Sequence, residues 1–300
     1  MRHRFSFITT VITLVALLLG NLVTATNSGD ACGANWPKCN GSLFPNLSNY
    51  KTIIEYSHRI FTGILGIIIL VNLFIAFKKK VKGEKLVTIL ACIGMFILIL
   101  QSLVGGLNVL LGTPPGFTTI DVTVSLSLLV SLVLLTTALQ RKPVSTLSNE
   151  NKLQQKNEKK LFYPILISFS LYYLEIIIGA FFKHSAASKV FLDIPAEEQL
   201  IYSQFLANLL YDSHGILNFV ILVSSVWLLF YSFRFRIMRT VSSLFLLFVL
   251  LTGLTGFISV FTSLGTISSS MHMIVSSITI AIGAIILGKT AFGSYVLIKR

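Results

Sequence analysis

Three histidines stand inside strongly apolar segments of the chain, namely His58, His214 and His272. Ionisable side chains are rare in such segments, and where they occur they usually face a bundle interior or a cavity and serve a function. Neutral imidazole is a ligand for iron, copper, zinc or nickel. The structural alternative is hydrogen bonding between helices, which is a modest effect in measured cases. Three histidines at one depth favour a ligand site over chance.

No cysteine or carboxylate cluster with metal-finger spacing accompanies His214 and His272. Two imidazoles from separate helices, facing across an apolar four-helix bundle, suit a haem with two axial histidines. Small residues would let a flat macrocycle approach a helix, and close helix packing explains them equally well. These small residues are Gly105, Gly106, Gly253 and Gly256.

Glu55 is an acidic residue one helical turn before His58, so both side chains project from the same face. A carboxyl group in apolar surroundings is costly to keep charged and can exchange protons with a reacting group. The alternative is a structural bond to Arg59 or to a neighbouring helix. The corresponding position before His214 is Tyr211, so this acid belongs to the first half alone.

Cys32 and Cys39 enclose six residues in a polar segment between two apolar runs. This segment is expected on the outer, oxidising side of the membrane, where a disulfide forms. The bond would act as a staple on the loop, or as a redox pair near a haem edge. Cys92, within an apolar run, is expected to be a small core residue.

The elements that must position these residues are membrane-spanning helices. The mean hydropathy is +0.83, and only 12% of the residues are charged, so an ordinary soluble chain is excluded. About 20 apolar residues suffice to cross a bilayer as a helix. We expect an all-α polytopic membrane protein with eight spans, at 5–24, 52–77, 86–112, 117–139, 161–183, 204–232, 238–262 and 269–298.

The net charge of +13 follows from membrane topology and does not indicate nucleic-acid binding. Eighteen of the 24 Lys and Arg residues fall at the two termini or in alternate connections between spans. Short cytoplasmic loops are enriched in positive charge. The chain is therefore expected in the cell (cytoplasmic) membrane with both termini in the cytoplasm.

The chain is expected to consist of two parallel repeats, each a four-helix bundle. His58 and His214 are 156 residues apart, and Asp121 and His272 are 151 apart, with similar landmarks in the same order. An even number of spans per half relates the repeats by an axis along the membrane normal. The predicted domains are 1–140, a cytoplasmic linker at 141–160, and 161–300.

Particular motifs resemble the haem A synthase family of bacterial type over nearly the whole chain. The loop Cys32-Gly-Ala-Asn-Trp-Pro-Lys-Cys39 is followed by Glu55-Tyr-Ser-His58-Arg59. The second half adds Gly179-Ala180, Lys183-His184 and the two later histidines. This combination is a specific signature.

The resemblance implies oxidation of the C8 methyl group of haem O, through hydroxylated forms, to the formyl group of haem A. It implies that His214 and His272 hold a haem b. The N-terminal half would receive haem O as substrate, with Glu55 catalytic and His58 ligating the substrate iron. A membrane electron acceptor and haem O synthase are the implied partners, while the oligomeric state is left open.

The sequence departs from the family pattern at Asp121, where the family has a second N-terminal histidine. A carboxylate can ligate iron directly or through water, or leave it five-coordinate. This departure motivates an alternative hypothesis, a haem-binding electron carrier or oxidase-assembly accessory without the oxidation activity. A transporter built on parallel repeats ranks last, because broken helices and mid-membrane charges are few.

Overall fold

The computed structural model describes residues 2–34, 38–140 except 79–84, and 156–292 except 197. In these ranges the secondary structure is helical, with one isolated bridge between Cys39 and Ser42. The helices are α1 (Arg2–Ala25), α2 (Tyr50–Lys78), α3 (Lys85–Leu110), α4 (Phe117–Gln140), η2 (Lys159–Leu161), α6 (Phe162–His184), α7 (Ala187–Phe191), α8 (Gln204–Arg234), α9 (Arg239–Phe261) and α10 (Thr266–Phe292).

Eight of the described helices are long and apolar enough to cross a membrane, which confirms the predicted fold class. Their bounds differ from the predicted spans by a few residues, because flanking polar residues continue a helix beyond its apolar run. The largest difference is at the fifth span, which begins at 156 instead of 161. The last predicted span continued to 298, and residues 293–298 lie outside the described ranges.

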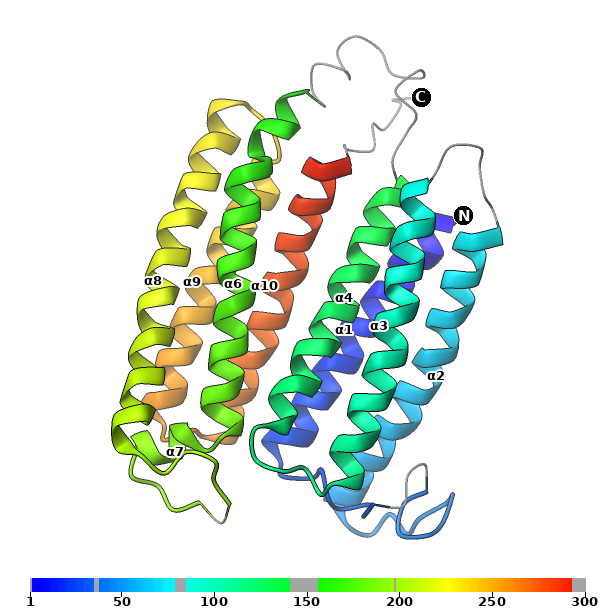
Figure 1. The fold of residues 1–300 in the computed structure, drawn as a ribbon, viewed down its shortest axis with the longest axis vertical. Helices are drawn as coiled ribbons and strands as arrows, with labels where there is room; N and C mark the ends of the chain where they lie inside the picture. Colours follow the sequence, from blue (N-terminus) through cyan, green and yellow to red (C-terminus); the bar gives the residue numbers. More distant parts are fainter. Residues whose placement is uncertain (1, 35–37, 79–84, 141–155, 197, 293–300) are drawn as a thin grey trace.

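The first four long helices pack in a ring, in which α1 contacts α2 and α4, and α3 contacts the same two helices. Figure 1 shows this group beside a second group formed by α6, α8, α9 and α10. In the second group α6 contacts α8 and α10, and α9 contacts the same two. Each ring can therefore enclose side chains from helices far apart in sequence. The duplication and the axis relating the halves stay predictions.

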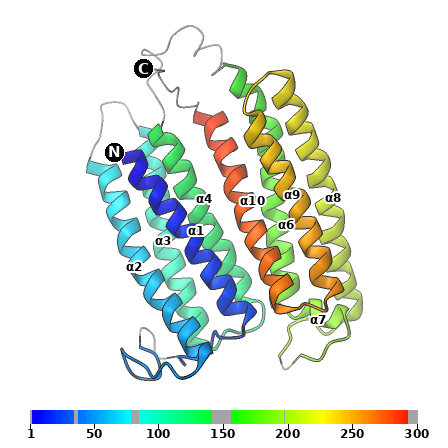
Figure 2. The same ribbon diagram turned by 180° about the vertical axis from the view of Figure 1, so that it is seen from behind.

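The two groups meet along α4 and α10, with α1 and α6 contributing at the sides. Figure 2 shows α10 and α1 adjacent from the opposite side. Buried residues of both groups, including Leu129 of α4 and Ile280 of α10, form one cluster across this contact. The hydroxyl of Tyr173 on α6 lies 2.5 Å from that of Ser127 on α4 and donates to the carbonyl of Thr123 at 2.9 Å. The halves are thus packed together by apolar and polar contacts.

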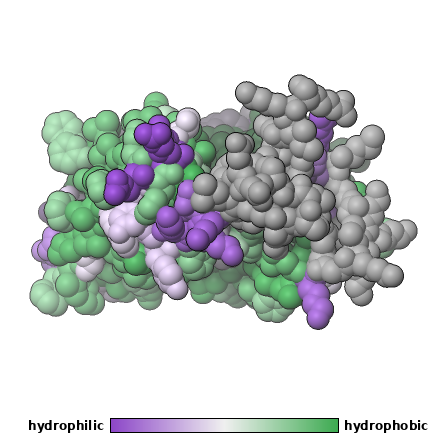
Figure 3. Space-filling view, turned by 90° about the horizontal axis from the view of Figure 1, so that it is seen from above, coloured by the Kyte–Doolittle hydropathy of each residue, from purple (hydrophilic) through white to green (hydrophobic). Residues whose placement is uncertain are grey.

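The ends of the molecule differ in what they carry. The start of α1, the end of α4, the start of α6 and the end of α10 lie at one end, and α7 and the loop after α1 lie at the other (Figure 1). A view onto the first end shows a cluster of hydrophilic residues beside the hydrophobic side chains of the helices (Figure 3). The basic α8–α9 connection lies there, with Arg234, Arg236 and Arg239.

One minor prediction is wrong. Cys92 of α3 was expected in the core, and it is exposed on the helix surface. A helix that crosses a membrane is apolar on its outer face as well, so hydrophobicity alone does not indicate which face is buried. Exposed Ile89, Ile93 and Phe96 on the same helix illustrate this.

Candidate functional site

The second ring brings His214 of α8 and His272 of α10 together. Their ring centroids are 6.4 Å apart, and the ring planes make an angle of 80°. α8 and α10 lie opposite each other in the ring of four helices, because both contact α6 and α9. The two imidazoles meet between them, in the interior of the bundle. The structure therefore brings the two predicted histidines together.

The Nδ1 atom of each imidazole faces an oxygen acceptor. His272 Nδ1 lies 3.1 Å from the carbonyl oxygen of Thr252 and 3.5 Å from the hydroxyl of Thr255. His214 Nδ1 lies 3.4 Å from Oε1 of Glu175, which is only 2% exposed. A ligating histidine almost always donates its second ring N–H to a carbonyl or carboxylate in this way. Both Nε2 atoms are then left as acceptors for a metal.

The spacing of the two rings suits one metal ion between them. A metal–imidazole bond is about 2 Å long, and each ring centre lies about 1 Å beyond its nitrogen, so two axial imidazoles have centroids about 6 Å apart. The observed 6.4 Å agrees with that value. Among the described residues no group of three or more His, Cys, Asp or Glu is placed to hold a metal ion. The residues present therefore fit a metal that brings its own equatorial ligands, as haem does.

Glycines make room for both imidazoles. A Cβ atom at Gly179 would lie 2.6 Å from Cε1 of His214, and one at Gly256 would lie 3.1 Å from Cε1 of His272. Of the glycines predicted to matter, Gly253 faces Asn218 instead, and Gly106 has nothing within 4 Å. Gly105 faces Asp121, where a Cβ would lie 3.6 Å from Oδ1.

In the first ring, His58 occupies a setting similar to that of His214. A Cβ at Gly20 of α1 would lie 3.2 Å from Cε1 of His58. Gly20 is on the first helix of its half, as Gly179 is on the first helix of the other. Nδ1 is buried without a hydrogen-bond partner among the described residues in both histidines, and the difference is that a carboxyl oxygen, Oε1 of Glu175, lies 3.4 Å from Nδ1 of His214.

Asp121 corresponds in position to His272. Gly105 precedes Asp121 by 16 residues and faces it, and Gly256 precedes His272 by the same 16 and faces it. Oδ1 of Asp121 accepts a hydrogen bond of 2.6 Å from Nε2 of Gln101. The carboxylate is thus held by an amide on α3.

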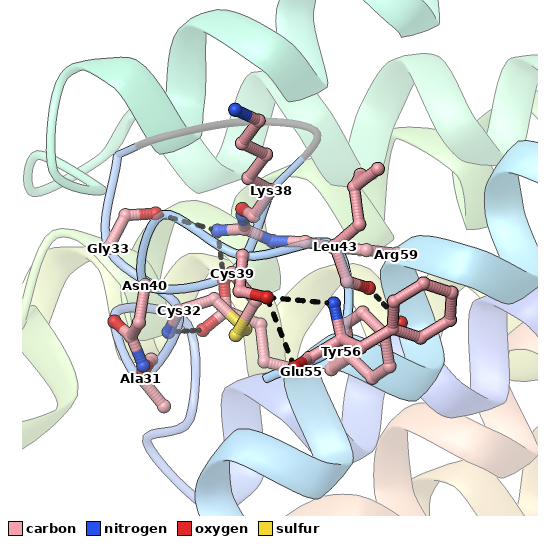
Figure 4. The surroundings of a disulfide bond; sticks show 12 residues. Ala31, Cys32, Gly33, Lys38, Cys39, Asn40, Leu43, Glu55, Tyr56 and Arg59 are labelled. Atoms are coloured by element: carbon pink, nitrogen blue, oxygen red, sulfur yellow. Dashed lines mark hydrogen bonds and ion pairs between the residues drawn. A yellow bond between two sulfur atoms is a disulfide. The ribbon is translucent and has the colours of Figure 1, made fainter. Parts of the chain in front are cut away.

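Glu55 lies against the disulfide loop near the start of α2 (Figure 4). Its Oε2 accepts from the backbone N–H of Cys32 at 2.7 Å, and its Oε1 accepts from Arg59 at 2.5 Å. The side chains are 4% and 7% exposed, respectively. The structural alternative considered for Glu55, a bond to Arg59, is therefore present. The acid and the loop form one unit.

Arg59 completes this unit by donating to two carbonyl oxygens of the loop, those of Gly33 at 2.9 Å and Lys38 at 2.8 Å (Figure 4). The predicted disulfide between Cys32 and Cys39 is present. Trp36 and Pro37 of the loop motif lie outside the described residues. The loop is held onto α2 by the same two residues, Glu55 and Arg59, that flank His58.

Sequence reasoning did not single out two residues of these sites. Glu175 was overlooked, although an acidic residue inside a predicted span was a sufficient signal. Gln101 gave no such signal, because a glutamine is unremarkable until its partner across the helix contact is known.

A family model described as cytochrome oxidase assembly protein (COX15-CtaA) matches residues 3–283. The chain belongs to this family. Its members among curated proteins include a haem A synthase of Halalkalibacterium halodurans, 31% identical over 287 residues, with 91% of this chain and 92% of the relative covered. The haem A synthase of Alkalihalophilus pseudofirmus is 29% identical over 279 residues, with the same coverage. That of Bacillus licheniformis is 35% identical over 193 residues, covering 63% of this chain and 60% of the relative.

Membership of the haem A synthase family and the eight apolar helices agree that this is a multi-pass membrane protein. The matched residues run from α1 into α10, so they include all the side chains described above.

Proposed function

We propose that this protein is an oxidoreductase that converts the C8 methyl group of haem O to the formyl group of haem A. The family and the names of its relatives support this reaction. The observation that carries it is the pair His214 and His272, with centroids 6.4 Å apart and each Nδ1 facing an oxygen. Such a pair suits a resident haem rather than a bare ion.

His214 and His272 would hold a haem b in the C-terminal half. When bound there, haem b supplies one-electron redox chemistry. The chain's contribution is to orient the two imidazoles through Glu175 and Thr252, and to leave space beside them at Gly179 and Gly256.

The N-terminal half would receive haem O as substrate, with His58 as the ligand to the substrate iron. Glu55 lies one turn away on the same helix and is the acidic residue nearest this histidine in sequence. We assign it the exchange of protons released as the methyl group is oxidised. Its bonds to Cys32 and Arg59 fix the position of the carboxylate and close the loop over this end of the ring.

With water as the source of the formyl oxygen, the oxidation of the methyl group releases protons and electrons in equal number. The electrons would pass to an acceptor in the membrane, and haem O synthase would deliver the substrate. We place the protein in the cytoplasmic membrane with both termini inside, because the basic residues gather at that end.

The test is to express the chain in a host that supplies haem O, extract the haems and separate them by chromatography. Unchanged protein should yield haem A or its hydroxylated precursor. Glu55→Gln keeps an oxygen that can accept from the N–H of Cys32 but cannot take up the proton, so it should lose the product while the protein still folds. A normal yield from Glu55→Gln would show that the role given to Glu55 is wrong.

A second candidate function is favoured by Asp121. It stands where the C-terminal half has His272, and Gln101 already occupies one of its oxygens. On this reading the protein carries haem b in its C-terminal half and acts as an electron carrier or an accessory in oxidase assembly. Haem b lost on changing His214 or His272, with haem O recovered unconverted, would support it against the first function.

A further inference from the structure

Glu175 is a buried acidic residue to which the reaction above assigns no chemical step. It lies on α6, is 2% exposed, and its Oε1 is 3.4 Å from Nδ1 of His214. Neither atom forms a hydrogen bond within the described ranges, and at this separation they do not form one with each other. Removing a carboxyl group from water without a partner is costly. Its placement therefore indicates a role towards the imidazole of His214, which its Oε1 faces.

The His214 ring is also confined on the side of α6. Gly179 is one turn after Glu175 on the same helix face, and a Cβ there would lie 2.6 Å from Cε1 and 3.1 Å from Nδ1 of His214. The ring thus lies against the α6 backbone with its Nδ1 toward the carboxyl group. A hydrogen bond between the two atoms would need only a small shift of the ring or the carboxyl group, and such bonds are often long before a ligand is bound.

The equivalent position in the N-terminal half carries no acceptor. Gly20 lies against Cε1 of His58 in the way that Gly179 lies against Cε1 of His214. The residue one turn before Gly20 is Ala16, which is 6% exposed and has no polar side chain. Nδ1 is buried without a hydrogen-bond partner at both histidines in the described structure, but at His214 a carboxyl oxygen lies 3.4 Å away. The two halves share the glycine contact and differ in the acid.

We propose that Glu175 is a positioning residue that makes His214 a fixed haem ligand, and that its absence at His58 makes the N-terminal site an exchangeable one. A hydrogen bond from Nδ1–H to a carboxylate fixes the tautomer and the orientation of the ring and increases the basicity of Nε2. A resident cofactor needs slow release, and a substrate that leaves as product needs fast release. The single acid therefore separates the two uses of a repeated haem-binding plan.

This inference rests on the proposed function, and its test separates the two. The protein is purified in detergent with haem b, and haem release is followed by transfer to apomyoglobin. The background variant His58→Ala limits binding to the C-terminal half. Glu175→Ala should release haem about 10- to 100-fold faster. Glu175→Gln retains an acceptor oxygen and should stay close to the parent rate.

Electron paramagnetic resonance of the ferric haem gives a second readout, because its g values depend on the orientation of the axial imidazoles. They should change in Glu175→Ala and be largely restored in Glu175→Gln. The control is Ser168→Ala on the same helix, which removes a buried hydroxyl that donates to the carbonyl of Pro164. It should leave the release rate and the g values unchanged, which excludes a general loosening of α6.

The N-terminal site is measured in His272→Ala. We expect haem to leave this N-terminal site at least as fast as it leaves the C-terminal site of Glu175→Ala. Haem that is lost during gel filtration is scored as fast release. Equal rates for Glu175→Ala and its parent, or slower release from the N-terminal half than from the C-terminal half, would overturn the inference alone. An unchanged protein without any haem b absorption would overturn the proposed function and this inference with it.

Discussion

Gly179 of α6 lies directly against the imidazole of His214 on α8, so closely that a Cβ there would lie 2.6 Å from Cε1. Real side chains do not approach to that distance, and the ring would have to move. The same relationship, less tight, joins Gly20 to His58. A glycine on the first helix of each half thus determines how close the histidine on the second helix can lie.

The first prediction concerns this contact. Gly179→Ala should displace His214 from its partner Glu175 and lower the affinity for haem b by about tenfold or more, as loss of ligand orientation generally does. Titration of the haem-free protein with haem b, followed by absorption, measures it. Gly215→Ala is the matched control, because nothing lies within 4 Å of a Cβ at that position beside His214. Equal affinities for the two variants would contradict the prediction.

The second prediction concerns Arg59, which binds the disulfide loop through two carbonyl oxygens and pairs with Glu55. Arg59→Ala leaves the buried Glu55 carboxylate without its cation, and breaking such a pair lowers stability by about 3–5 kcal/mol. We also expect faster reduction of the Cys32–Cys39 bond by dithiothreitol, because the loop is no longer held onto α2. Thiol labelling over time measures the reduction.

Lys51→Ala is the control for Arg59→Ala. It removes a positive charge from the first turn of the same helix and leaves the Glu55–Arg59 pair in place. A reduction rate in Arg59→Ala equal to that of Lys51→Ala would mean that the loop is held by other contacts.

The third prediction concerns Asp121 and Gln101. Asp121→His introduces an imidazole at the position that corresponds to His272. The amide of Gln101 can turn its oxygen toward the new Nδ1–H, because an amide carries both donors and an acceptor. In a His272→Ala background, the N-terminal half should then retain haem b about tenfold more tightly, since a second oriented ligand is added. Haem transfer to apomyoglobin measures retention.

Asp121→Leu is the matching control. It leaves the Gln101 amide, now bonded at 2.6 Å to Asp121, without its acceptor. We expect a loss of stability of about 1–3 kcal/mol and no gain in haem retention. Tighter retention in both variants would indicate that removal of the negative charge, and not the imidazole, is responsible.

The spans were predictable to within a few residues because a helix in lipid must satisfy its own backbone hydrogen bonds and be apolar along its length. The polar residues inside the spans, such as His214 and His272, were recognisable for the same reason. The rotation of each helix was not predictable, because apolar residues occupy both the lipid-facing and the buried sides. Cys92 was misplaced on that account.

The contacts of the site depend on those rotations. Glu175 could have been noticed as an acid within a span, but not as the partner of His214, since only the packing of α6 against α8 brings them together. Glu55 shows the opposite case. Its position one turn from His58 follows from helical periodicity, whereas its bond to the N–H of Cys32 depends on the path of the loop.

The fourth prediction concerns the contact between the two halves. A Cβ at Gly288 of α10 would lie 3.0 Å from Cβ and 3.2 Å from Cγ2 of Thr137 on α4. Thr137 cannot easily turn away, because its χ1 is restricted by β-branching and its hydroxyl donates to the carbonyl of Leu134 at 2.8 Å. Gly288→Ala should therefore lower stability by about 1–3 kcal/mol through overpacking, as measured by thermal unfolding in detergent.

The double variant Gly288→Ala with Thr137→Ala removes the crowded atoms and should recover most of the lost stability. Gly63→Ala on α2 is the control, because nothing lies within 4 Å of its added Cβ, and alanine is the better helix former by about 1 kcal/mol. It should be neutral or stabilising. A Gly288→Ala protein as stable as Gly63→Ala would show that α4 and α10 can separate without cost, so that the halves are not joined by this contact.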